Sequence, residues 1–467
     1  MNIVNPGRYG RLLIAVGVVG RLALAWLPFE SWQVPFGPLT DDSFYYFGIA
    51  RNLAAGSGLT FDSVTLTSGF QALWALLLVP IWWVVPSANA VLPIHAVLSL
   101  LAVIHGLSSL AIWRLASGFG GRRGGLFALG LWTFSPYVVD HGLNGMETGL
   151  ATCLLLWTLE RYLFCIRQRN DLVAGGLLGL LAGLCWLARV DSVVLVMVLA
   201  ADYLFRFGSR SIRPLIMATA VGAAVVSPWV TWCLVIGGSI LPESGAAVRV
   251  LSELYCERAI FSNFAYGSLA FYGDNLARLA GEVVSQPLIP IPVIPIGYVL
   301  HQVMDPGRFH AIPLMLTSAV YGAFGALAWR LGLMSRKTFS VLPWLWVIGL
   351  LAAYALRVPG HWFYGRYVFS ILAVGCVLSG IVMDRLGRHL PPRFFRLWLI
   401  MTTLSVGLTF VFQARDMFWR TDGKNINRHM RLAKVLRSRP DLPQPLGVFQ
   451  AGAIGYFSNM PFIALDG

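Results

Sequence analysis

Long apolar stretches follow one another along most of this chain, separated by short polar segments. A membrane-spanning helix needs about 20 mostly apolar residues, and eleven stretches come close to that length. The expected spans are 12–29, 91–113, 124–140, 147–166, 172–188, 192–205, 214–236, 311–329, 341–356, 367–383 and 397–414. The pattern predicts an all-α polytopic membrane protein, with about eleven transmembrane helices in one domain over residues 1–414.

A further apolar stretch, 70–86, has the features of a surface helix. Pro80 lies in its middle, and Trp74, Trp82 and Trp83 are residues of the type that favours the headgroup region. If this stretch crossed the membrane, every later loop would change sides and the first two groups of basic residues would lie on opposite faces. We therefore expect it to lie flat on the outer surface, within the first outer loop.

Charge supports the membrane interpretation. Only 12% of the residues are charged, about half of the roughly 25% found in soluble domains. The net charge of +14 is spread in small basic groups between the apolar stretches, which is the pattern that orients membrane proteins. A nucleic-acid-binding protein would instead gather basic residues on one face. The composition therefore indicates the lipid bilayer as a partner and argues against nucleic acid.

Acidic residues concentrate on the side that the topology makes outer. The outer segments before residue 237 and around 357–366 hold few basic residues, namely Arg51, Arg189, Arg357 and Arg366. By contrast, the acidic residues at or within inner ends are Glu160, Asp171, Asp202 and Asp384. We therefore expect any chemistry that uses carboxylates at the outer face.

The first outer loop contains the acidic pair Asp41 and Asp42, followed by the aromatic residues Phe44, Tyr45 and Tyr46. The pair stands at the start of an expected helix, where an acid gains about 0.3–1 kcal/mol from the helix dipole. A carboxylate that takes a proton from a hydroxyl group can instead accelerate a reaction by about 10²–10⁴-fold. Both roles fit the sequence, and the second makes the pair the candidate catalytic residues.

Two more outer positions carry ionisable residues. Glu147 follows the tight turn in "DHGLNGMETG" and is a candidate second acid, although it also suits the first turn of the next span. Arg189 and Asp191, in "ARVDS", join two short spans. Ionisable residues at such depth are usually paired with each other or functional, and both alternatives stay open here.

The segment "RVPGHWFYGRYVFS" places His361, Tyr364, Arg366 and Tyr367 directly before a span. A guanidinium group binds phosphate through two parallel hydrogen bonds. These residues, together with Arg189 and Asp191, are therefore candidates for binding a donor phosphate or a lipid headgroup. Anchoring of the span at the interface explains the segment equally well.

The C-terminal residues 415–467 are expected to form a short outer segment, periplasmic or extracellular. Ile426, Met430, Ala433 and Leu436 share one face of a helix. The residues that follow, "LGVFQAGAIGYFSNMPFIALDG", predict a strand, a short helix and a second strand. The segment is thus a small α/β unit appended to the membrane domain.

Together these motifs resemble the GT-C superfamily of membrane glycosyltransferases, and most nearly its bacterial protein-mannosyltransferase-like members. The resemblance rests on "DDSFYYFGIARNLAAGSGLTFD" and "TSGFQALW", with support from "GMET", "RVDS" and "GRY". Relatives often have asparagine and His-Pro where this chain has Ser68, Gln71 and Ala72. The C-terminal residues resemble the opening of a longer outer domain, so the segment is expected to be shortened.

The resemblance implies a multi-pass protein of the bacterial inner (plasma) membrane, with its active face outward. It implies a polyprenyl-phosphate-sugar donor, a glycan, lipid or protein acceptor, and inversion in a single displacement. Asp41 would be the general base with Asp42 beside it, Glu147 the second acid, and Arg366 the ligand of the leaving phosphate. No cofactor is certain, and Asp41, Asp42 and Glu147 are the candidate ligands if a divalent cation takes part.

The main alternative is a transporter or flippase for a lipid-linked substrate. Such proteins often contain repeats, with ionisable residues near the middle of the membrane. This chain has no convincing repeat, and most of its charges lie at the ends of spans, Arg21 and His105 excepted. A catalytically inactive protein that binds polyprenyl lipids is a third possibility.

Overall fold

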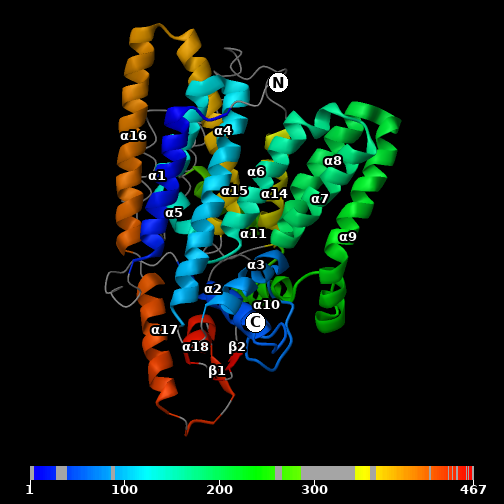
Figure 1. Ribbon diagram of the computed structural model, residues 1–467, viewed down its shortest axis with the longest axis vertical. Helices are drawn as coiled ribbons and strands as arrows, with labels where there is room; N and C mark the ends of the chain where they lie inside the picture. Colours follow the sequence, from blue (N-terminus) through cyan, green and yellow to red (C-terminus); the bar gives the residue numbers. More distant parts are fainter. Residues whose placement is uncertain are drawn as a thin grey trace.

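The computed structural model describes residues 5–27, 39–85, 90–257, 266–284, 342–357, 364–419, 422–439, 441–443, 445–448, 451–458, 460 and 462–464. Its helices form a tall bundle with a smaller group of elements at one end (Figure 1). The bundle consists of α1 (Arg8–Ala25), α4 (Leu92–Phe134), α5 (Pro136–Gly142), α6 (Thr148–Phe164), α7 (Leu172–Ala188), α8 (Val193–Phe207), α9 (Ile212–Gly237), α11 (Leu269–Val284), α14 (Leu342–Arg357), α15 (Tyr364–His389) and α16 (Pro392–Trp419).

The end group contains the remaining named elements. They are α2 (Asp41–Ala54), α3 (Ala72–Val84), α10 (Glu243–Glu257), α17 (Asp422–Arg437), β1 (Leu446–Val448), α18 (Ala451–Ser458) and β2 (Phe462–Ala464). Short 3-10 turns connect parts of the bundle: η2 (Ile166–Gln168), η3 (Val190–Ser192) and η4 (Gly208–Ser211).

The structure confirms the all-helical, multi-pass character of the membrane domain. Among the described residues, five segments are long and apolar enough to cross a membrane: Leu92–Phe134, Thr148–Gln168, Val190–Gly237, Tyr364–His389 and Pro392–Val411. Shorter apolar helices lie at Ala72–Val84, Leu172–Ala188 and Leu342–Leu356. The expected span 311–329 lies outside the described residues.

The expected spans 91–113 and 124–140 correspond to the two arms of α4. The helix is interrupted at Gly121, whose φ of 75° is readily adopted by glycine. His105 and Trp132 stack across the arms with their ring centroids 5.5 Å apart, so the arms run side by side. The second arm ends earlier than expected, at Phe134, because Ser135 caps the separate helix α5 and Pro136 begins it.

Helices α7 and α9 approach each other very closely. A Cβ atom on Gly175 would lie 2.1 Å from the carbonyl oxygen of Pro214, and one on Gly179 would lie 2.2 Å from that of Ala218. Small residues at such positions allow two backbones to meet, which is how membrane helices often pack. This pair of glycines therefore fixes the contact between two of the bundle's helices.

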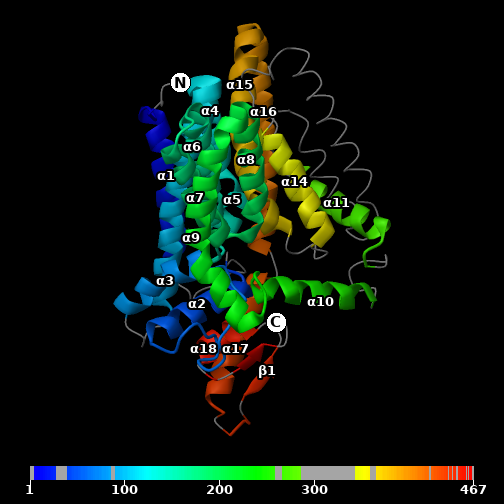
Figure 2. The ribbon, with the colours of Figure 1, turned by 90° about the vertical axis from the view of Figure 1, so that its right-hand side faces the viewer.

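The end group lies across the foot of the bundle. Figure 2 shows α3 and α10 running crosswise to the long helices. The 13 residues of α3 reach only about 20 Å at 1.5 Å per residue, too short for a span. The C-terminal elements follow the predicted order of strand, helix and strand, and β1 pairs with β2 in parallel with Leu446 opposite Phe462.

Candidate functional site

The acidic pair at the start of α2 divides between two different surroundings. Asp42 faces α15, where Arg366 Nη1 donates to Asp42 Oδ2 over 2.7 Å. The Asp42 side chain is 44% exposed, so a substrate can reach it. The Asp41 side chain is only 13% exposed and faces α18. The two adjacent carboxylates therefore cannot serve the same function in this arrangement.

Asp41 is held by the C-terminal segment. Its Oδ1 accepts a hydrogen bond from the backbone N–H of Ala453 over 2.9 Å, and its Oδ2 accepts one from Gly452 over 3.1 Å. His429 Nδ1 lies 3.3 Å from Oδ1. Both carboxylate oxygens of Asp41 are thus occupied by contacts within the protein.

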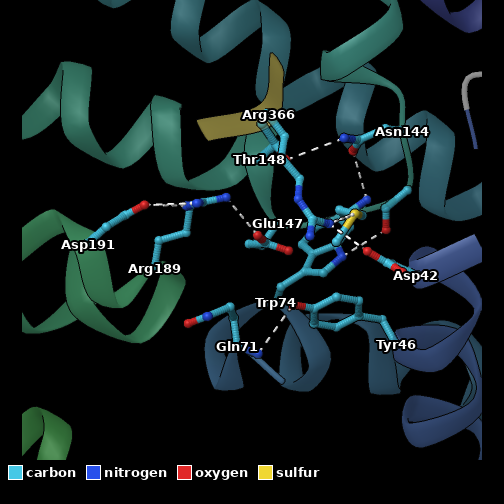
Figure 3. A network of polar contacts seen from close by, with 12 residues as sticks. Asp42, Tyr46, Gln71, Trp74, Asn144, Glu147, Thr148, Arg189, Asp191 and Arg366 are labelled. Carbon is cyan, nitrogen blue, oxygen red and sulfur yellow. Dashed lines mark hydrogen bonds and ion pairs between the residues drawn. The ribbon is translucent and has the colours of Figure 1, made fainter. Parts of the chain in front are cut away.

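Glu147 and the "RVDS" residues form a second group beside the first, drawn in Figure 3. Glu147, directly before α6, accepts from Arg189 Nη1 over 3.0 Å. Arg189 also donates to Asp191 Oδ2 through Nε (3.0 Å) and Nη2 (2.8 Å). Tyr354 of α14 donates to the same Asp191 carboxylate. The structure therefore brings Glu147, Arg189 and Asp191 into one continuous network.

Tyr367 links the two groups through its ring. The guanidinium of Arg189 lies 5.0 Å from the ring centroid and that of Arg366 lies 5.4 Å from it, distances at which a cation is attracted to an aromatic face. Tyr354 stacks on Tyr367 with centroids 4.7 Å apart. Two arginines that would otherwise repel each other are thereby held on one aromatic platform.

Tyr46 extends the network into α2. It lies one helical turn after Asp42, and its hydroxyl accepts from the backbone N–H of Gln71 over 3.3 Å. Burial and the negative charge of Glu147 raise the pKa of Tyr46 well above its usual value. Its hydroxyl therefore remains protonated, with the Glu147 carboxylate as its hydrogen-bond acceptor.

The turn before Glu147 is rigidly built. Trp74 Nε1 donates to the carbonyl of Gly145 over 3.0 Å, and the Met146 N–H donates to Asn144 Oδ1 over 3.0 Å. The Asn144 side chain also donates to Thr148 Oγ1 over 3.4 Å. Gly145 has a φ of 79°, which glycine adopts without strain. These contacts fix the position of Glu147.

Other candidate residues lie elsewhere. Tyr364 is buried and donates to Asn275 of α11 over 3.1 Å, so it belongs to the packing of the bundle. His361 lies outside the described residues. Nothing in the sequence singles out Tyr354 or His429, which reach the site only through folding. Tyr46 stands out there as an aromatic residue, and its spacing of one helical turn from Asp42 could have marked it as a site residue.

The candidate cation ligands do not fit a metal site as they stand. Asp41 faces α18, while Asp42 and Glu147 are each paired with an arginine. No group of three metal-ligating side chains occurs among the described residues. We therefore derive no step of the reaction through a divalent cation.

One family model and several solved structures relate the chain to known proteins. Residues 89–232 match the family model described as dolichyl-phosphate-mannose-protein mannosyltransferase. No curated protein matches the chain in sequence. ArnT from Cupriavidus metallidurans, solved with bound undecaprenyl phosphate, has a TM-score of 0.59 at 14% identity, with 97% of this chain and 85% of that chain covered.

The oligosaccharyltransferase of Archaeoglobus fulgidus is also similar. Its apo form has a TM-score of 0.61 at 15% identity, covering 98% of this chain and 65% of that chain. Its complex with Zn and sulfate has a TM-score of 0.57 at 14% identity, covering 98% of this chain and 62% of that chain. This chain thus spans just under two thirds of that enzyme, and at these identities the likeness shows a shared fold.

Proposed function

We propose that this chain is a GT-C membrane glycosyltransferase that transfers a sugar from a polyprenyl-phosphate donor to an acceptor hydroxyl. The match of residues 89–232 to the dolichyl-phosphate-mannose-protein mannosyltransferase family model supports this proposal. The acceptor is a glycan, a lipid or a protein. The name of the matching family supports a lipid-phosphate sugar donor, and so does the undecaprenyl phosphate bound to ArnT.

The proposed reaction is a single displacement with inversion. The acceptor oxygen forms a bond to the anomeric carbon while the bond from that carbon to the phosphate oxygen breaks. The electron pair of the broken bond stays on the phosphate, and the hydroxyl proton passes to a carboxylate of the protein. The site must therefore supply one reachable carboxylate and one cation beside it.

The Asp42–Arg366 pair carries this proposal. Asp42 Oδ2 is held by Arg366, and the side chain is exposed enough for an acceptor to approach, so Asp42 is the proposed base. This differs from the expectation for Asp41, whose carboxylate oxygens already accept backbone hydrogen bonds from α18. Proton acceptance by a carboxylate contributes about 10²–10⁴-fold to a rate.

The arginines have separate proposed functions. Arg366 stabilises the negative charge that grows on the leaving phosphate, because a guanidinium matches phosphate oxygens geometrically. Arg189 holds Glu147 and Asp191 and so keeps the second acid and Tyr367 in place. Burial and the charge of Glu147 keep the Tyr46 hydroxyl protonated, and this hydroxyl in turn helps to hold the Glu147 carboxylate in place.

The proposed topology and orientation in the membrane follow from the sequence. We propose about eleven spans, a location in the bacterial inner membrane, and an outward orientation of the end group that carries the site. The arrangement in Figure 2, with α3 and α10 crosswise below the bundle, supports an interfacial position for this end.

The test is direct transfer by the purified full-length protein. It is incubated in detergent or liposomes with a panel of radiolabelled polyprenyl-phosphate sugars and candidate acceptors. We expect at least one donor to be used, and Asp42→Asn to lose at least about 10²-fold in turnover.

Asp441→Asn is the matched control, because Asp441 also pairs with an arginine but is exposed and remote from the site. It should keep the rate of the unmodified protein. Absence of transfer with every donor, or an unchanged rate in Asp42→Asn, would show that the proposal is wrong.

A further inference from the structure

The contact between α18 and α2 joins residues about 400 positions apart in sequence, immediately beside the proposed base (Figure 1). We infer that Asp41 is a positioning residue. The C-terminal segment binds its carboxylate through hydrogen bonds and so holds the first turn of α2 with Asp42 directed at Arg366. This inference rests on the proposed function and assigns the C-terminal segment a part in it.

The binding of the Asp41 carboxylate by α18 is chemically specific. The first N–H groups of a helix have no partner within the helix, and a carboxylate placed there accepts their hydrogen bonds and meets the positive end of the helix dipole. Asp41 does this for Gly452 and Ala453, and His429 of α17 adds a third contact. An asparagine of the same shape would lack the charge and one of the two acceptor oxygens.

Further contacts hold α2 along its length. The N–H of Ala451 donates to the hydroxyl of Tyr45 over 3.0 Å. At the other end of α2, Arg51 donates to the carbonyl of Tyr456 over 3.0 Å, with its guanidinium 4.9 Å from the ring centroid. Phe44 packs against the same ring, with centroids 5.6 Å apart. Helix α2 therefore contacts α18 along most of its length.

Gly452 makes the close approach possible. A Cβ atom on this residue would lie 2.2 Å from the Asp41 carbonyl oxygen and 2.9 Å from Asp41 Oδ2. The first of these atoms belongs to the backbone and cannot turn away. Any larger residue at position 452 must therefore push the first turn of α2 away from α18.

Such a shift acts on Asp42 but not directly on the arginines. Asp42 is the next residue in the same helical turn, whereas Arg366 and Arg189 come from α15 and the α7–η3 junction. A displacement of about 1 Å at a reacting group can cost about 10²-fold in rate. Weakening the contact between Asp41 and α18 should therefore lower kcat and leave the KM for the donor nearly unchanged.

The experiment compares Gly452→Ala and Asp41→Asn with Gly130→Ala in the full-length protein. Gly130 has open space around the position of an added Cβ, so it is the matched control. For the first two variants we expect kcat to fall about 10–100-fold, with donor KM within about threefold. Hydrogen exchange at the amides of α2 should become faster, while Gly130→Ala behaves as the unmodified protein.

The pH dependence separates positioning from proton transfer. If Asp42 is the base, the residual kcat of Asp41→Asn keeps the acid limb of the pH–rate profile, because the substitution leaves the base itself unchanged. Loss of that limb in Asp41→Asn, with its retention in Asp42→Asn, would overturn the inference. Unchanged kcat and unchanged exchange in Gly452→Ala would overturn it as well.

Two further measurements apply if Gly452→Ala does not fold or if the unmodified protein uses no donor. If Gly452→Ala does not fold, Arg51→Met weakens the opposite end of the contact between α2 and α18. We expect the same loss in kcat alone, and an unchanged kcat would contradict the positioning role of this contact. If the unmodified protein uses no donor, the proposed function fails, and the hydrogen-exchange rates of the α2 amides alone test the inference. Faster exchange in Gly452→Ala supports the contact between Asp41 and α18 as what holds α2, and unchanged exchange refutes it.

Discussion

The two arginines of the site have different partners. Arg189 binds two carboxylates and contacts the hydroxyl of Tyr354, so it serves mainly to hold its neighbours. Arg366 pairs with the partly exposed Asp42 and contacts the sulfur of Met146. A phosphate bound beside Asp42 would therefore lie next to the Arg366 guanidinium.

We expect Arg366→Ala to lose about 3–4 kcal/mol of transition-state stabilisation, a fall of roughly 10²–10³-fold in kcat/KM for the donor. Arg366→Lys should retain partial activity, since lysine keeps the charge but loses the planar fork. Arg439→Ala, which removes an exposed arginine paired with Asp441, is the control. Turnover of Arg366→Ala at the unmodified rate would remove this residue from the site.

Among the elements, the α7–α9 pair shows how far packing goes beyond hydrophobic length. Both helices are apolar, and their sequences predict two spans. Gly175 and Gly179 of α7 meet the backbone of α9 directly, whereas Gly176 between them lies 3.8 Å from the nearest atom, in the side chain of Met217. Two neighbouring glycines of one helix thus tolerate larger residues very differently.

We expect Gly179→Leu to destabilise the protein by about 1–3 kcal/mol or more, because a side chain cannot enter the backbone contact without separating the helices. Gly176→Leu should change stability little. The measurement is the midpoint of thermal unfolding in one detergent, together with the yield of monodisperse protein. Equal midpoints for the two variants would contradict the packing described here.

For the whole molecule, one end gathers α2, α3, α10, α17 and α18, while the turn between α8 and α9 lies at the opposite end (Figure 1). The expected distribution of basic residues makes the first end outer. The site network, built from Asp42, Glu147, Arg189 and Arg366 (Figure 3), lies where this end meets the bundle.

We therefore expect cysteines introduced at Ser57 and Ser438 to react with an impermeant thiol reagent in intact spheroplasts. A cysteine at Ser209, in η4 between α8 and α9, should react only after the membrane is opened. All three positions are exposed in the structure, and the unmodified chain, with its six native cysteines, gives the background. Reaction at position 209 with protection at 57 would reverse the orientation.

The sequence alone determined the helical membrane domain and the loops in which chemistry was sought, because apolar length and charge distribution are properties of local segments. It also gave the strand, helix and strand at the C-terminus. Only the tertiary structure decided which acid of the pair faces Arg366. Asp41 and Asp42 are chemically identical neighbours, and they differ because α18, about 400 residues away, supplies N–H groups to one, while Arg366 of α15 supplies a guanidinium to the other.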